Sequence, residues 1–182
     1  MIIRMTSGVC GYNTGTIIDC YNTGNVSGVA FNGGVCGDND GTIINCYNTG
    51  GVSGDYHVGD ICGDNYGATV TNCYYLSDTE IDHKDGTVGK TKEQFANGEV
   101  AYLLQADRTE TIWGQTIGTD LYPVLGGKKV YQNREYDSCD ESGNVVAITY
   151  SNEQENKYTH TLVKTDRKAD CVTAGEDEYW TC

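Results

Sequence analysis

Cysteine is the residue type with the clearest capacity for chemistry in this 182-residue chain, which contains nine cysteines. Six of them recur in two sets with a period of 26, one extra residue preceding the last member of the second set: Cys10, Cys36 and Cys62, and Cys20, Cys46 and Cys73. Thiols so placed can pack as small apolar side chains, pair as disulfides or bind a soft metal. Packing is the leading interpretation. Pairing within each repeat stays open, and metal binding is weakest because no repeat cysteine belongs to a C-x-x-C.

Two further groups of residues could bind a metal. A thiol and imidazole set would comprise Cys139, His160, Cys171 and Cys182, although the chain stops before the second half of a C-x-x-C. Asp38 and Asp40 supply oxygens of the kind calcium prefers. Their spacing matches neither an EF-hand loop nor a calcium-binding nonapeptide, so ordinary turn chemistry is the favoured interpretation. We expect neither a metal nor another cofactor.

Catalytic motifs are missing from the sequence. It contains no Gly-x-Ser-x-Gly, no His-Glu-x-x-His and no phosphate-binding loop. The three histidines lie in three different segments, and none stands beside a nucleophile with an orienting carboxylate. We therefore expect a protein that is not an enzyme.

The elements that position the repeat cysteines are short strands and turns. Each repeat has an apolar run, an Asn/Asp/Gly turn, a β-branched run such as Thr42-Ile43-Ile44, a second turn and a third short strand such as Val52-Ser53. A fixed period in this range is typical of stacked repeats. The sequence predicts a mostly β protein with a short parallel β-solenoid of about three 26-residue coils. Stacking would align asparagines and tyrosines in ladders: Asn13, Asn39 and Asn65, and Tyr21, Tyr47 and Tyr74.

These repeats resemble the GLUG repeat over residues 5–78, best in the second unit, Gly33 to Gly54. The first unit departs at Asp19, where the family usually has Asn, and the third departs most, as a last coil does. The resemblance implies a non-catalytic spacer or binding stalk in a large secreted or surface-attached bacterial protein, such as an adhesin.

Residues 79–131 are expected to cover the open end of the last coil. Residues 79–90 are interpreted as a linker, and Thr91-Lys92-Glu93-Gln94 predicts a helix start. Asn97-Gly98 weakens that helix and favours a split into two. The small α/β cap would end with Trp113 and Tyr122, which are interpreted as core residues, with a sugar-binding platform as the alternative.

Residues 132–182 form the third predicted domain, a partial β module with a strand over 145–150. Its ending is similar to a small Cys-rich module of bacterial surface proteins, truncated at Cys182.

Net charge and hydropathy limit the classes of partner that the chain could bind. The net charge of −14 disfavours nucleic acid, and no apolar run is long enough for a membrane helix. The first six residues do not resemble a signal peptide, and we expect an export signal upstream and an extracellular or cell-surface location. The leading function is an adhesin-like binding or structural module with a host or matrix glycan or protein as ligand. The alternatives are an accessory region of a secreted peptidase or glycoside hydrolase, and a metal-binding module at the C-terminal cysteines.

Overall fold

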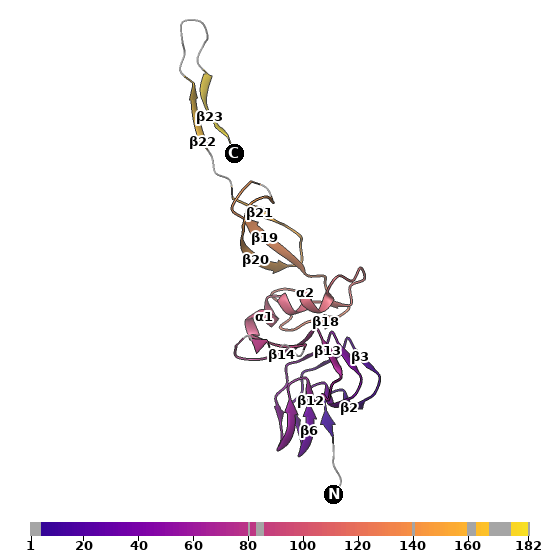
Figure 1. The fold of residues 1–182 in the computed structure, drawn as a ribbon. Coiled ribbons are helices and arrows are strands. Elements are labelled where there is room, and N and C mark those ends of the chain that lie inside the picture. The colour runs from indigo at the N-terminus through magenta and orange to yellow at the C-terminus, as the bar shows by residue number, and fades with distance from the viewer. Residues whose placement is uncertain are drawn as a thin grey trace. The chain divides into compact units, whose positions relative to one another are not determined.

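The computed structural model of the chain describes residues 5–79, 81–82, 86–139, 141–159, 163–167 and 176–181. Over these residues the fold is mostly β, with two short helices (Figure 1). The chain forms two compact units, Met1–Tyr131 with Tyr150–Asn152, and Gln132–Thr149 with Glu153–Cys182. Within the described residues, no helix is both long and apolar enough to cross a membrane.

The first unit begins with the predicted parallel β-solenoid, whose three coils stack in register. Residues 26 apart are paired along the stack, as in Cys10, Cys36 and Cys62, and the interval becomes 27 after the extra residue in the third coil. Five ladders carry the stack: β1 (Thr6–Ser7), β6 (Ala30–Gly33) and β11 (Tyr56–Gly59); β2 (Cys10–Asn13), β7 (Cys36–Asn39) and β12 (Cys62–Asp64); β3 (Thr16–Ile18), β8 (Thr42–Ile44) and β13 (Thr69–Thr71); β4 (Tyr21–Asn22), β9 (Tyr47–Asn48) and β14 (Cys73–Leu76); β5 (Val26–Ser27) and β10 (Val52–Ser53).

A full coil therefore has five strand segments, whereas the sequence indicated three. The two missed ladders contain β4 and β6, whose residues are tyrosine, asparagine, alanine, phenylalanine and glycine, none of them β-branched. One corner between strands is a single left-handed residue, with φ of 53° at Asp19, Asn45 and Asn72. Asn and Asp tolerate this conformation better than other non-glycine residues, which explains their recurrence before the second cysteine. At Gly33, a Cβ atom would lie 1.7 Å from the Cys36 carbonyl oxygen, so a side chain cannot fit there.

The asparagine ladder lies inside a turn and satisfies its backbone. Asn13 Nδ2 donates to Asn39 Oδ1 at 2.6 Å, and Asn39 Nδ2 donates to Asn65 Oδ1 at 2.8 Å. The same Oδ1 atom of Asn39 accepts from the Gly41 amide at 3.3 Å. Asn39 is fully buried, so these bonds replace water at the turn.

The cysteine ladders line the interior of the coils. None of the six repeat cysteines forms a disulfide, so the alternative of pairing within coils is wrong in this structure. Cys36, Cys46 and Cys73 are fully buried in a core with Ile17, Val35, Ile43, Ile61 and Val70. Each thiol also donates to a carbonyl oxygen two residues away, as Cys46 does to Ile44 at 3.2 Å and Cys36 to Asp38 at 3.1 Å. Each S–H group therefore has an acceptor close by in its own coil, although the Ile44 and Thr71 carbonyls also accept backbone amides, from Asp19 and Asn45.

The helical segment packs along the side of the coils and not, as expected, over the open end of the last one. Helix α1 (Lys92–Ala96) starts at Thr91 with the predicted capping box, and α2 (Glu99–Gln105) follows the break at Asn97 and Gly98. Phe95, Val100, Leu104 and Trp113 share one core with Tyr47 and Tyr74. Tyr47 is 1% exposed because this second layer covers it, and its hydroxyl donates to the Pro123 carbonyl at 2.7 Å. Tyr21, Tyr47 and Tyr74, which we call the tyrosine column, thus form the side of the coils on which the helical segment packs.

The residues interpreted as a linker contain strands. β16 (Thr87–Lys90) pairs in parallel with β14, and β15 (Ile81–Asp82) pairs antiparallel with β16. Together they extend the tyrosine-bearing sheet beyond the third coil. The composition did not predict these strands, because the segment is rich in polar residues and glycine. Backbone pairing to an existing sheet edge does not require an apolar pattern. A hairpin of β17 (Trp113–Gly114) and β18 (Val124–Leu125) completes the helical part.

The second unit is built of antiparallel and parallel strand pairs. β19 (Tyr131–Tyr136) lies between β20 (Val145–Ser151), where a strand was predicted, and β21 (Lys157–Tyr158). β22 (Val163–Arg167) and β23 (Glu176–Thr181) form an antiparallel pair. Cys139 is disulfide-bonded, which the sequence did not predict.

We predict that Asn39→Ala destabilises the protein by about 2–4 kcal/mol, because it removes bonds to two asparagines and one amide in a buried turn. Urea denaturation followed by circular dichroism measures the change. Asn25→Ala is the matched control, because exposed Asn25 accepts one bond, from the Gly51 amide, and should cost about 1 kcal/mol or less. Equal losses in the two variants would contradict the proposed role of the ladder.

Candidate functional site

The candidate site is an outward surface of the coils that we call the acidic face, consisting of Tyr12, Phe31, Asp38, Asp40, His57 and Asp64. Tyr12, Asp38 and Asp64 occupy one position of successive coils and lie side by side along the stack. The Tyr12 hydroxyl donates to Asp40, and His57 Nδ1 lies 3.3 Å from Asp64 Oδ2. Phe31 and His57, again one coil apart, stack with ring centroids 4.6 Å apart and planes 2° from parallel.

Backbone strain accompanies the aromatic pair. Phe31 has φ of 55° and His57 has φ of 49°, a conformation that is uncommon for residues other than glycine and rarest for bulky ones such as Phe. The cost is of the order of 1 kcal/mol at each residue. Strained residues persist where the surrounding structure holds them in place, and they are frequent at functional surfaces. The sequence reasoning missed both residues, since no local pattern marks a left-handed Phe or His.

The close spacing of carboxylates on the acidic face changes the pKa values of groups there. Partial burial raises the pKa of Asp38, and the neighbouring Asp40 and Asp64 raise it further. The pKa of Tyr12 is raised by its hydrogen bond to Asp40. Both shifts show that added negative charge is unfavourable here, so the face is suited to a ligand that brings positive charge or hydrogen-bond donors.

The predicted metal candidates do not assemble. No group of three His, Cys, Asp or Glu side chains suited to a metal occurs in the part of the chain that the structure describes. Asp38 and Asp40 belong to the acidic face, and the Asp40 carboxylate is engaged by Tyr12. Cys139 is committed to its disulfide, and a disulfide sulfur is not a thiolate ligand. His160, Cys171 and Cys182 lie outside the described residues.

Trp113 and Tyr122 do not form a sugar-binding platform. The Trp113 side chain is fully buried, with its ring 5.5 Å from that of Tyr47 and 6.0 Å from that of Tyr21. Tyr122 packs edge-on against Phe95. A platform needs an exposed ring face, so the alternative to the core interpretation is wrong for Trp113.

One residue that holds the helical segment to the coils was visible in the sequence as an irregularity. The Asp19 carboxylate accepts two hydrogen bonds of 2.8 Å from Arg108 and one of 2.9 Å from Trp113 Nε1. In the third coil, the equivalent Asn72 donates to the Leu103 carbonyl at 3.0 Å. The Asp at position 19 therefore replaces the usual Asn where a guanidinium has to be bound, since Asn offers no charge and a single acceptor oxygen.

The tyrosine column behaves as a desolvated surface. Burial raises the pKa of Tyr74 to about 12, with a further contribution from neighbouring groups. Burial likewise raises the pKa of Tyr47, and Tyr21 adds to the effect. Tyr21 stacks on Tyr47 at 5.2 Å between ring centroids but is 43% exposed, because no coil covers it in the described structure.

Comparison with protein-family models, with curated proteins and with solved structures found no match for this chain.

We predict that Asp19 and Arg108 are energetically coupled by about 1 kcal/mol, as expected for a partly buried ion pair in which Arg108 Nη1 donates to both carboxylate oxygens. A double-mutant cycle of Asp19→Asn and Arg108→Gln, measured by urea denaturation, gives this value. Arg134→Gln removes an exposed arginine of the other unit and should show no coupling to Asp19→Asn. Additive effects of the Asp19 and Arg108 substitutions would contradict the role assigned to the pair.

Proposed function

We propose that this chain is a non-catalytic binding and structural module of a secreted or surface-attached bacterial protein, with an adhesin-like role. The resemblance of its repeats to the GLUG pattern supports this proposal. The observation that carries it is the contrast between interior and exterior of the coils. Interior positions hold nearly the same residue in every coil. The outward position of Tyr12, Asp38 and Asp64 differs between coils, although other outward positions, such as Ser27 and Ser53, are repeated.

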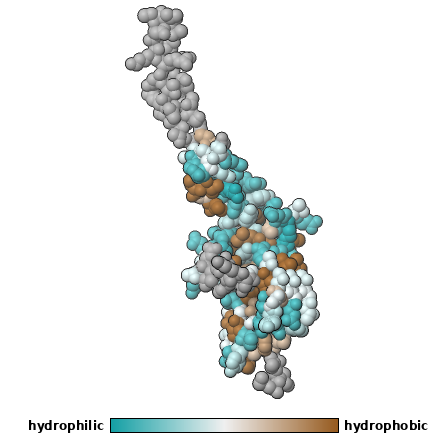
Figure 2. Space-filling view, viewed as in Figure 1, coloured by the Kyte–Doolittle hydropathy of each residue, from teal (hydrophilic) through white to brown (hydrophobic). Residues whose placement is uncertain are grey.

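That contrast favours display of a surface over chemistry. The stack fixes the outward side chains at intervals of about 4.8 Å without depending on their identity, so the exterior can vary freely. The acidic face combines a stacked aromatic pair with carboxylates, and the whole chain has a net charge of −14. Complementary charge speeds encounter with a partner and fixes its orientation. The ligand class that these features support best is a basic matrix protein, and a glycan is the second class. Figure 2 shows that hydrophilic and apolar residues are mixed over the face of the coils in view.

A binding screen tests the proposal. Immobilised protein is exposed to arrays of matrix proteins and of glycans at low and at physiological salt. We expect binding that weakens with salt and falls at least about tenfold in the double variant Asp38→Asn, Asp64→Asn. The control, Asp107→Asn with Glu110→Gln, removes two exposed charges from the helical part and should bind like the wild type.

Three outcomes are informative. Salt-sensitive binding of a protein that the acidic-face variant loses supports the proposal, and salt-insensitive glycan binding that the variant loses would assign the second ligand class. An equal loss in the control variant would show that net charge, and not the acidic face, drives binding. Turnover of a peptide or polysaccharide substrate by the purified chain would contradict the non-catalytic assignment.

A further inference from the structure

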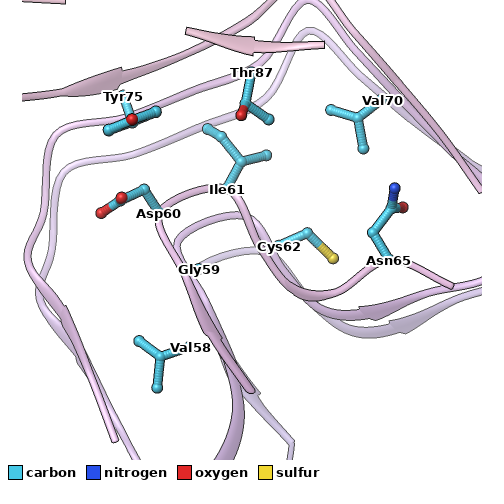
Figure 3. A pocket seen from close by; sticks show the side chains of 9 residues that line it. All are labelled: Val58, Gly59, Asp60, Ile61, Cys62, Asn65, Val70, Tyr75 and Thr87. Atoms are coloured by element: carbon cyan, nitrogen blue, oxygen red, sulfur yellow. The ribbon is translucent and has the colours of Figure 1, made fainter. Parts of the chain in front are cut away.

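The interior of the third coil is open to a cavity at the end of the stack. The cavity has a volume of about 340 Å³. Its lining is Val58, Gly59, Asp60, Ile61, Cys62, Asn65, Val70, Tyr75 and Thr87. Figure 3 shows the Cys62 side chain at this opening, with Ile61 and Val70 nearby. A thiol that belongs to the repeat core is thus reachable from outside, through a space large enough for a small molecule.

Directly beneath Cys62 lies a second thiol. Cys62 and Cys36 are register partners on β12 and β7, so their Cα atoms are separated by about one inter-strand spacing, 4.8 Å. This spacing falls within the Cα separation of about 4.4–6.8 Å found in disulfides. Cys36 is fully buried, whereas Cys62 is partly exposed. The pair therefore has one member that can meet a reagent and one that is protected.

The two thiols differ in how readily each one loses its proton. The Cys62 thiol donates to the Asp64 carbonyl oxygen at 2.7 Å, and the Cys36 thiol donates to the Asp38 carbonyl oxygen at 3.1 Å. The hydrogen bond from Cys62 lowers the pKa of Cys36, although burial opposes it. The same bond, followed by burial, raises the pKa of Cys62. The thiolate form is therefore favoured at Cys36 and disfavoured at Cys62, so accessibility and not acidity selects Cys62 as the first sulfur to react.

We propose that Cys36 and Cys62 form a dithiol redox site that reacts with small aliphatic disulfides entering at the end of the third coil. In the first step, the Cys62 thiolate attacks one sulfur of the reagent, whose S–S bond breaks. A mixed disulfide forms at Cys62, and the released thiolate takes up a proton. In the second step, the Cys36 thiolate attacks the Cys62 sulfur, the mixed disulfide breaks, and a second thiol leaves. The protein loses two electrons and two protons, and the reagent is reduced to two thiols.

The other repeat cysteines are less suited to this reaction. Cys46 and Cys73 are also one coil apart, but both are fully buried and neither lines the cavity. Cys10 is partly exposed and stacks on Cys36 from the other side. Cys10, however, does not line the cavity, so a reagent that enters there meets Cys62 and not Cys10. The product would join the second coil to the third at the open end of the stack.

Peptide mapping tests the site. Fully reduced, folded protein is treated with bis(2-hydroxyethyl) disulfide, quenched with acid and alkylated. Combined cleavage after aromatic residues and before aspartate leaves each of the six repeat cysteines in a separate peptide. We expect a Cys36–Cys62 linkage to form at least about tenfold faster than any linkage between Cys46 and Cys73, because access of the reagent limits the rate. The oxidised protein should melt at a temperature several degrees higher, because the link restricts the unfolded chain.

Three variants make the test specific. Cys36→Ser should stop the reaction at the mixed disulfide on Cys62, and Cys62→Ser should abolish both steps. Cys73→Ser, which alters the buried pair, should leave the Cys36–Cys62 linkage intact. Circular dichroism and the melting temperature verify that each variant is folded before treatment. Preferential modification of Cys10, equal rates for the two pairs, or failure of Cys36→Ser to retain the mixed disulfide would each overturn the proposal.

Discussion

Successive coils of the solenoid must place equivalent residues about one inter-strand spacing apart, and every other feature of the first unit follows from this requirement. The backbone has to return to the same point after 26 residues, which favours Asn, Asp and Gly at several of the turns. Asn45 adopts the left-handed conformation at one corner, and Gly33 avoids a clash at another. Side-chain ladders then form as a consequence, since identical groups one spacing apart either pack or exchange hydrogen bonds. Asn13, Asn39 and Asn65 exchange hydrogen bonds along the stack, and the repeat cysteines pack in its interior.

Coil stacking alone leaves a row of tyrosines on one side, and this row determines how the remaining chain folds. Tyr47 and Tyr74 are buried only because Phe95, Leu104 and Trp113 pack on them. Polar contacts fix the position of that second layer: Asp19 binds Arg108 and Trp113 at the first coil, and Asn72 binds the backbone of α2 at the third. A three-coil stack is short, and in such a stack each coil contacts only its neighbours. A layer that touches all three coils adds contacts between non-neighbouring coils and thereby makes the stack more cooperative. The same arrangement keeps the acidic face free of covering elements from this layer, because the layer uses the tyrosine side of the coils.

Repeat period and residue type were sufficient to predict the stacked coils, their register and the asparagine, cysteine and tyrosine ladders, because these depend on local pattern and translation along one axis. The break at Asn97 and Gly98 and the capping box at Thr91 were likewise predictable, since both depend on neighbouring residues alone. The lateral position of the helices was not, because an apolar stripe on α2 specifies that it packs but not on which surface. β16 escaped detection because an unpaired strand edge can accept a segment of almost any composition. The acidic face combines left-handed Phe31 and His57 with carboxylates from other coils, and a single sequence gives no signal for that combination. Asp19 did give a signal, as a departure from its own repeat, and its partner Arg108 lies 89 residues further along the chain.

Native-state hydrogen exchange tests the central claim, that the coils and the helical segment form one cooperative unit through the tyrosine column. The amides of β8 and β9 in the second coil and those of α2 report on the two sides of this contact. If the column joins them, both sets exchange with the same free energy of opening, and both respond equally to added denaturant. Tyr47→Ala should then lower protection of the two sets together. Exchange of α2 at a markedly lower free energy than β8, unchanged by the substitution at Tyr47, would show that the helical segment opens independently and would contradict the account.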